Sequence, residues 1–250
     1  MSKQQKQQNK FFQMKASADH KSADVFIYGE ITKYAWEEYG EVSSITFKNE
    51  LDALGESIET INLYINSPGG SVFETMAIIA MLQRHPAEII SHIDALAASC
   101  ASVLPMISKR VIMYNNSMMM IHNAWTYAWG NANELRKAAD DIERINQSMI
   151  QFYLDRAGEK LDADTLKQLL DAETWLTAEE AVNYGLCDEI ISANNAAACI
   201  DEKWSKKYQN VPTQLLQQSI APQMSDEERE LREKILADSK ANLTYLNTIL

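Results

Sequence analysis

One serine, one histidine and a pair of glycines could together carry out acyl transfer in this sequence. Ser99 lies in the stretch LAASCA, among small side chains and next to Cys100. A serine hydroxyl attacks a carbonyl only where a base accepts its proton and oriented donors hold the oxyanion that forms. His122, which ends the stretch MMMIH, is the candidate base. We interpret Cys100 as a small buried hydrophobic residue, because unpaired cysteines commonly pack in that way.

The beginnings of two helices are predicted to supply the oxyanion donors. At ALAASCAS a strand enters a helix, so Ser99 is expected near a helix N-terminus, where free backbone N–H groups favour negative charge. Upstream, SPGG places Gly69 and Gly70 at a second strand-to-helix turn, where glycine can adopt dihedral angles that other residues avoid. Each feature alone also fits an ordinary role, a helix cap for the serine and a simple turn for SPGG. Side by side in a parallel sheet, the two turns could form one oxyanion hole.

Alternating strands and helices are expected to position these residues. Strand patterns lie at DVFIYGEI, INLYIN, EIISHID, RVIMY, MMMIH and LCDEIIS, and helical patterns at 45–54, at 71–85, from about 99 and at about 133–157. This alternation predicts an α/β fold, a mostly parallel sheet with helices packed against it. The helix at 71–85 is expected to place five residues on one apolar face: Phe73, Met76, Ala77, Ala80 and Met81.

Three regions are expected along the chain. They are a basic disordered tail at 1–23, an ordered core at 24–192, and a linker with a separate C-terminal helix at 193–250. The tail is predicted from its lysines and glutamines, since such a composition buries little apolar surface. The C-terminal helix is predicted from a capping box formed by Ser225 and Glu228.

Composition argues against several classes of function. The 250 residues include 23 Lys and Arg against 35 Asp and Glu, a net charge of −12, so nucleic acid is not an expected partner. The start lacks a signal peptide's apolar region, and no apolar run approaches the roughly 20 residues of a membrane helix. We therefore expect a cytoplasmic protein without a membrane partner. The three cysteines and four histidines lack paired ligand spacing, so we expect neither a disulfide nor a metal.

Several of these stretches together resemble the Clp protease proteolytic subunit family (ClpP). The similar segments are IYGEI, LYINSPGGSVFETMAI, DALAASCASV, MMMIHNAW, GNANELRKAADDIERI and AETWLTAEEAVNYGLCDEI, in the family's order between residues 25 and 191. The resemblance is greatest to the ClpP-like head maturation proteases of tailed phages. It implies the ClpP/crotonase-like fold of repeated strand-turn-helix units, in which the helix at about 133–157 is a projecting handle.

The resemblance also implies roles for single residues. Ser99 would be the nucleophile and His122 the general base, with the backbone N–H groups of Gly70 and Cys100 as the oxyanion hole. The residues implied in substrate binding are Gly69, Ser71, Asn123 and Trp125. No metal or other cofactor is implied.

The third member of the triad departs from the cellular family pattern. Where cellular ClpP has an aspartate before a segment like RFLSA, this chain has Glu173 before TWLTA. A glutamate, one methylene longer, can still accept the imidazole N–H if the backbone lies slightly further back. Asp171 is the alternative carboxylate, and a Ser–His dyad without a carboxylate is the other possibility.

The function implied by the resemblance is that of a serine endopeptidase assembled as two stacked heptameric rings. Its implied substrates are capsid or scaffold proteins during phage prohead maturation. The alternatives are a cellular-type ClpP fed by an unfoldase ATPase, a crotonase-like acyl-CoA enzyme, and an inactive ring scaffold. In the implied handle, an apolar stripe with a/d spacing is expected to face a neighbouring subunit: Leu135, Ala138, Ile142, Ile145, Met149 and Phe152.

Overall fold

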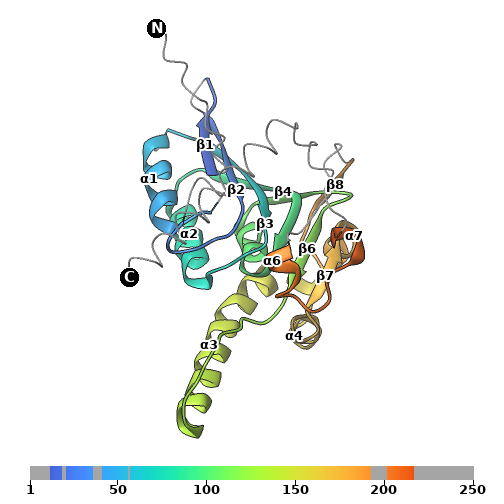
Figure 1. Ribbon diagram of the computed structural model, residues 1–250. Coiled ribbons are helices and arrows are strands. Elements are labelled where there is room, and N and C mark those ends of the chain that lie inside the picture. Colours follow the sequence, from blue (N-terminus) through green and yellow to red (C-terminus); the bar gives the residue numbers. More distant parts are fainter. Residues whose placement is uncertain (1–11, 19–20, 36–40, 56, 193–201, 217–250) are drawn as a thin grey trace, which may run out of the picture. The chain divides into compact units, whose positions relative to one another are not determined.

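The computed structural model describes residues 12–18, 21–35, 41–55, 57–192 and 202–216 (Figure 1). Their strands are β1 (Phe12–Ala16), β2 (Ser22–Tyr28), β3 (Thr60–Ser67), β4 (Glu88–Ala98), β5 (Arg110–Tyr114), β6 (Met118–Ile121), β7 (Thr174–Thr177) and β8 (Glu189–Ile191). The α-helices are α1 (Ser44–Leu54), α2 (Val72–Arg84), α3 (Ala132–Ala157), α4 (Ala163–Asp171), α5 (Ala178–Asn183), α6 (Glu202–Ser205) and α7 (Thr213–Leu216). Two segments are 3₁₀ helices, η2 (Ser99–Ile107) and η3 (Gly158–Lys160). The predicted α/β fold is confirmed.

The strands form one sheet in which β4 is shared between two branches. The main path is β1-β2-β3-β4-β5-β8, and its strands from β2 onward are parallel while β1 is antiparallel to β2. The first half of β4 pairs with β5 from Ile90 to Ile93, and its last residues pair in parallel with β6 from Leu96 to Ala98. Antiparallel β7 then extends this second branch beyond β6. The carboxyl ends of β4 and β6 therefore lie next to each other.

The core lies between the sheet and α1, α2 and η2. Alternate residues of β3 are fully buried, as expected for a strand with one face on the core: Ile61, Leu63 and Ile65. The buried side of α2 belongs to the same cluster of apolar side chains, through Ile78 and Leu82 among others.

The sequence predicted the wrong buried face for α2. The buried residues of this helix are Thr75, Ile78, Ile79 and Leu82, whereas the side chain of Phe73 is 72% exposed and the other four predicted residues are half-buried. The helix carries apolar residues around most of its circumference, so periodicity alone did not select the face. The Ser71 side chain caps the start of the helix, and the packing of Ile78 and Leu82 in the core selects the buried face.

The helix predicted from about Ser99 is a buried 3₁₀ helix. It runs from Ser99 to Ile107, contains Pro105, and begins without a side-chain cap. This tightly wound segment is buried from Cys100 to Met106, and its proline has no N–H to donate.

Two parts of the expected tail and linker are folded. β1, which lies within the tail expected at 1–23, pairs antiparallel with β2. Within the linker expected at 193–250, residues 202–216 form two short helices and bury Trp204, Tyr208 and Leu215. Local polarity suggested a linker, but these three side chains are large and apolar enough to pack on the sheet. The capping box at Ser225 and Glu228 lies outside the described residues.

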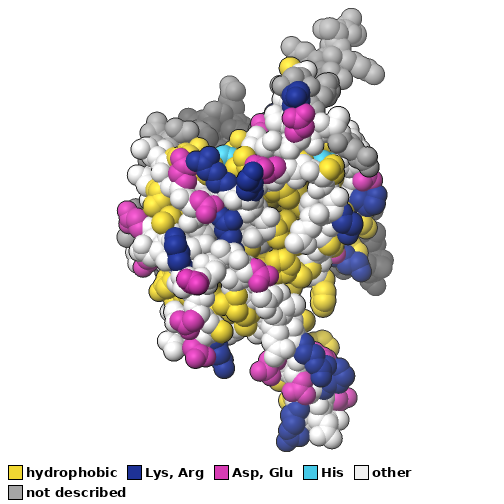
Figure 2. Space-filling view, turned by 180° about the vertical axis from the view of Figure 1, so that it is seen from behind, with side chains coloured by type: hydrophobic (Ala, Val, Ile, Leu, Met, Phe, Trp, Pro, Cys, Tyr) yellow, Lys and Arg dark blue, Asp and Glu magenta, His cyan; other side chains and the backbone are white. Residues whose placement is uncertain are grey.

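The long helix α3 confirms the expected element at about 133–157 and projects from the sheet (Figure 1). A capping box of Asn131 and Glu134 starts the helix. Its buried residues, Met149, Tyr153 and Ala157, all lie in its C-terminal half, and Leu135 is 44% exposed. Figure 2 shows Lys, Arg, Asp and Glu side chains gathered at the lower, projecting end. Leu135, at the N-terminal end of the apolar stripe, is therefore not covered by this chain's own sheet, and Ala138 and Ile142 are half-buried.

The α2 packing predicts a difference between two large-to-small substitutions. Ile78→Ala should lower the free energy of unfolding by about 2–5 kcal/mol, because it leaves a cavity in the core. Phe73→Ala should lower it by less than ~1 kcal/mol, because the side chain is solvent-exposed. Denaturant unfolding of both variants measures the difference, and equal losses would show that the Phe73 face is buried.

Candidate active site

Ser99 and His122 meet at the ends of two neighbouring parallel strands. The Oγ atom of Ser99 lies 2.7 Å from the Nε2 atom of His122. Ala98 pairs with Met120 at the ends of β4 and β6. Ser99 directly follows Ala98, and His122 lies two residues after Met120. Ser99 has a φ of 54°, in the left-handed region that residues other than glycine seldom occupy. Such backbone strain is concentrated at functional sites, and here it accompanies a nucleophile–base contact.

The SPGG turn packs directly against the backbone at Ser99. A Cβ atom on Gly69 would lie 2.7 Å from the carbonyl oxygen of Ala98 and 2.7 Å from the Cβ atom of Ser99. No other residue type fits this approach, and the φ of 92° at Gly69 adds to the requirement. The two strand-to-helix turns are therefore adjacent, as the sequence predicted.

The next glycine is oriented by hydrogen bonds to Ile31. The carbonyl of Gly69 accepts from the N–H of Ile31 at 2.9 Å, and the N–H of Ser71 donates to the carbonyl of Ile31 at 2.7 Å. In this parallel bridge, Gly70 itself directs its N–H away from Ile31. On that other side, the backbone of Gly70 helps to lower the pKa of the Cys100 thiol. The N–H of Gly70 thus lies beside the turn that carries Ser99.

Cys100 is buried and unsuited to act as a nucleophile. Burial raises the pKa of its thiol to about 11, and bonding to Thr75 and nearby backbone groups offsets only part of this. The hydroxyl of Thr75 donates to the Sγ atom of Cys100 at 3.1 Å. Because the thiolate is the reactive form, this thiol is inert near neutral pH.

A buried hydrogen-bond network connects the carbonyl of Ser99 to α3. The Oγ atom of Ser102 donates to the carbonyl oxygen of Ser99 at 2.6 Å and lies 2.6 Å from the hydroxyl of Tyr153. Tyr153 belongs to the C-terminal half of α3. The backbone of Ser99 is thus held from the helix side as well as from the sheet.

Glu173 lies beside His122, but the two side chains are not hydrogen-bonded to each other. β7 pairs with β6 in the register Thr174 to Ile121, which places the preceding Glu173 opposite His122. The Oε1 atom of Glu173 accepts from the N–H groups of Gln209 at 2.6 Å and Asn210 at 2.8 Å. Both partners belong to the segment that the sequence had suggested was a linker.

Asp171 makes a different contact. Its Oδ1 atom accepts from the Nδ2 atom of Asn123 at 2.7 Å. The charge of Glu173 acts on His122, whereas no such effect of Asp171 on His122 is resolved. Of the two candidate carboxylates, Glu173 is therefore the one coupled electrostatically to the imidazole.

The pKa of His122 reflects burial and this charge together. Burial lowers the pKa of the imidazole, and the Glu173 carboxylate raises it by less. The net direction is downward, so the imidazole stays neutral to lower pH than an exposed histidine. A neutral Nε2 atom facing the Ser99 hydroxyl can accept its proton.

Tyr208 is a site residue that the sequence analysis missed. Its hydroxyl donates to the carbonyl oxygen of Pro68, and its ring meets the ring of His122 edge-on at 5.6 Å. Trp204 stacks on it at 5.7 Å, and Tyr208 is only 5% exposed. The spacing of Trp204 and Tyr208, four residues apart in KWSKKYQN, is a signal of apolar packing within one helical turn.

The predicted substrate-binding residues separate into two pairs. Asn123 and Trp125 line an open cavity of about 440 Å³ that also includes His122 and Glu173. Gly69 and Ser71 do not line it: Gly69 is buried against the Ser99 turn, and the Ser71 side chain caps α2.

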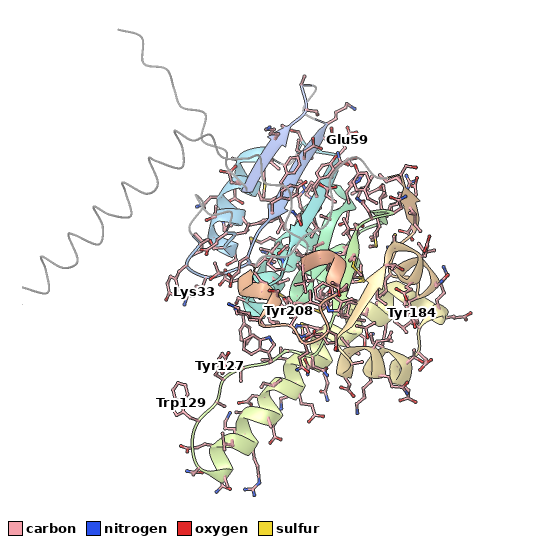
Figure 3. The ribbon with its side chains drawn as sticks, turned by 45° about the vertical axis from the view of Figure 1, so that its right-hand side comes forward. Lys33, Glu59, Tyr127, Trp129, Tyr184 and Tyr208 are labelled. Carbon is pink, nitrogen blue, oxygen red and sulfur yellow. The ribbon has the colours of Figure 1, made fainter. Side chains whose placement is uncertain are left out.

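Lys207 lies over the rings of Trp204 and Trp125, at 4.1 and 5.9 Å from their centroids. Figure 3 shows Tyr208 beside α6, and Tyr127 and Trp129 on the stretch that precedes α3.

The described residues contain neither a candidate metal cluster nor a candidate membrane-spanning helix. No group of three His, Cys, Asp or Glu side chains in that part of the chain could hold a metal ion. None of the helices described there has the length and apolar character needed to cross a bilayer.

Comparison with known proteins identifies the family. The family described as Clp protease matches residues 8–194. ATP-dependent Clp protease proteolytic subunits from two strains of Bacteroides fragilis are each 33% identical over 137 residues, which is 52% of this chain. The matched region spans 63% and 60% of the length of these two relatives. The chain belongs to the Clp protease family.

Proposed function

We propose that this protein is a serine endopeptidase with Ser99 as its nucleophile and His122 as its general base. The observation that carries the proposal is the 2.7 Å contact between the Ser99 Oγ and His122 Nε2 atoms. In the proposed reaction, Oγ attacks the scissile carbonyl while Nε2 takes its proton, and that proton then passes to the leaving amine. Water, deprotonated by the neutral imidazole, hydrolyses the acyl-enzyme and regenerates the serine.

The proposed oxyanion hole consists of the backbone N–H groups of Gly70 and Cys100. Its support is the close packing of the SPGG turn on Ser99 and the orientation of Gly70 away from Ile31. The backbone N–H groups are rigidly placed, so they can stabilise the developing charge without reorganisation.

Glu173 is the proposed third member of the triad. Its position opposite His122 and its effect on the imidazole pKa favour it over Asp171, which is bonded to Asn123. A carboxylate hydrogen-bonded to the Nδ1 atom would orient the imidazole and stabilise its protonated form. In the present structure its Oε1 atom accepts from the backbone N–H groups of Gln209 and Asn210.

The proposed assembly is a pair of stacked heptameric rings joined through α3. Its support is the projecting half of the helix, which leaves Leu135 and the neighbouring part of the apolar stripe outside this chain's core. The proposed substrates are capsid or scaffold proteins of a phage prohead, on the resemblance to head maturation proteases. The alternative is a peptidase fed by an unfoldase ATPase, favoured by the similarity to ATP-dependent Clp proteolytic subunits. Co-purification with a Clp ATPase distinguishes the two.

Substitution at two adjacent residues tests the nucleophile. Ser99→Ala should lower peptidase turnover at least about 10³-fold while circular dichroism remains unchanged, because only one oxygen is removed. Cys100→Ser should stay within about tenfold of the wild type, because the thiol is inert and its backbone N–H is retained. Loss of activity in the cysteine variant alone would refute the assignment.

The pH dependence of Ser99 reactivity tests the base. The rate of fluorophosphonate labelling at Ser99 should rise with pH and reach half its maximum below 6.5, the ordinary histidine pKa, because burial of His122 favours the neutral form. Glu173→Gln should move this midpoint further down, because it removes the charge that raises the pKa. The other charged groups around the same cavity are Asp171, Lys206 and Lys207. A midpoint above 6.5 in the wild type would contradict the role of burial.

Charges on the projecting stripe of α3 test the assembly. Leu135→Asp combined with Ile142→Asp should give folded particles smaller than the wild type, because carboxylates buried without partners at a ring contact cost several kcal/mol. Arg136→Asp, on the charged side of the same turn, is the matched control and should assemble normally. Sedimentation velocity measures the size, and full-size particles from the double variant would place the stripe outside any subunit contact.

A further inference from the structure

We propose that residues 202–216, here called the covering segment, inhibit the active site of the same chain. The covering segment places Tyr208 over Ser99 and His122, and it holds the Glu173 carboxylate through the backbone of Gln209 and Asn210. This inference rests on the proposed peptidase function. It adds a regulatory state in which the nucleophile and base are formed but a polypeptide cannot reach them.

The first contact blocks access to the nucleophile. The Tyr208 hydroxyl donates to the carbonyl oxygen of Pro68, on the turn that packs against Ser99, and the ring meets His122 edge-on. The side chain is also in contact with Ser99, a contact that slightly offsets the burial that raises the pKa of the Tyr208 phenol. A scissile carbonyl must occupy the space beside Ser99 and His122 to be attacked. Tyr208 therefore competes with a substrate for the same space.

The second contact engages the triad carboxylate. Two backbone N–H groups donate to one oxygen of Glu173 at 2.6 and 2.8 Å, and charge-assisted hydrogen bonds of this length are strong. The side-chain amide of Asn210 also donates to the carbonyl of Ala172, the residue before Glu173, at 2.8 Å. Glu173 consequently influences His122 by its charge and makes no hydrogen bond to it. Departure of the covering segment would release the Oε1 atom and let the carboxylate turn toward the imidazole.

Apolar packing holds the covering segment in place. Trp204 and Tyr208 form a cluster with the ends of β4 and β6, at Leu96, Ala98 and Met120. Leu215 is buried against Ala95 further along. The two contacts with the active site therefore belong to a segment anchored along the second branch of the sheet.

Substitution of the tyrosine tests the block on access. In the full-length chain, Tyr208→Ala should raise the rate of fluorophosphonate labelling at Ser99 at least about tenfold over the wild type, by opening the space at the nucleophile. Tyr208→Phe keeps the buried ring and loses the bond to Pro68, so it should give a smaller rise and serves if the alanine variant unfolds. Tyr34→Ala, at a tyrosine whose side chain is 77% exposed, is the matched control and should label at the wild-type rate.

A backbone variant tests the engagement of Glu173. Gln209→Pro removes one of the two N–H donors, whereas Gln209→Ala removes only the side chain. The proline variant should label faster than the alanine variant, and its labelling midpoint should lie at higher pH, because the freed carboxylate stabilises protonated His122. A purely structural role for residue 209 would not shift the midpoint.

The outcomes separate the two proposals. If Ser99 is labelled at the same rate in the wild type, Tyr208→Ala and Tyr208→Phe, the inhibition is refuted while the peptidase proposal stands. Slower labelling in a folded Tyr208 variant also refutes inhibition, because it makes Tyr208 a residue that assists the site. If Ser99 fails to react in every variant, the nucleophile itself is refuted and the inhibition with it. Labelled sites are located by mass spectrometry.

Discussion

The parallel pairing of β4 with β6 is the constraint on which the rest of the site depends. Ser99 and His122 are 23 residues apart in the chain, and no local turn brings them together. They meet because the two strands run side by side and end at the same edge, where Ala98 pairs with Met120. β7 adds Glu173 to this edge through its register with β6, and α2 begins at the adjacent glycine turn. Each chemical group therefore enters from the end of a different element.

Much of this arrangement could be predicted because it depends on local signals. Strand composition, the glycines of SPGG and the small residues around Ser99 predicted the strands and the two adjacent turns. The face of α2 could not be chosen, because residues such as Phe73 and Ile78 are equally apolar and only the tertiary packing separates them. The 3₁₀ winding of η2 is likewise set by its buried surroundings rather than by a distinct sequence pattern.

The covering segment was missed for a related reason. KWSKKYQN and the stretch after it are mostly polar, and the residues that fold it, such as Trp204, Tyr208 and Leu215, gain stability only against a distant surface. The hydrogen-bond partners of Glu173 could not be predicted for the same reason. The sequence placed it near a family triad position, but its bonds to Gln209 and Asn210 depend on a segment 36 residues further along. Non-local burial, rather than residue type, decides both.

The Ser102 hydroxyl connects α3 to the backbone carbonyl of Ser99. The connection begins at Tyr153, in the buried half of the helix, whose hydroxyl reaches the Ser99 carbonyl through the Ser102 side chain. At 1.5 Å per residue, about 25 Å of α3 lies between its N-terminal end and Met149, the first of its buried residues. A displacement of a single ångström in a reacting group can cost about 10²-fold in rate. The alignment of the serine is therefore mechanically tied to the tip of a helix that this chain alone leaves unsupported.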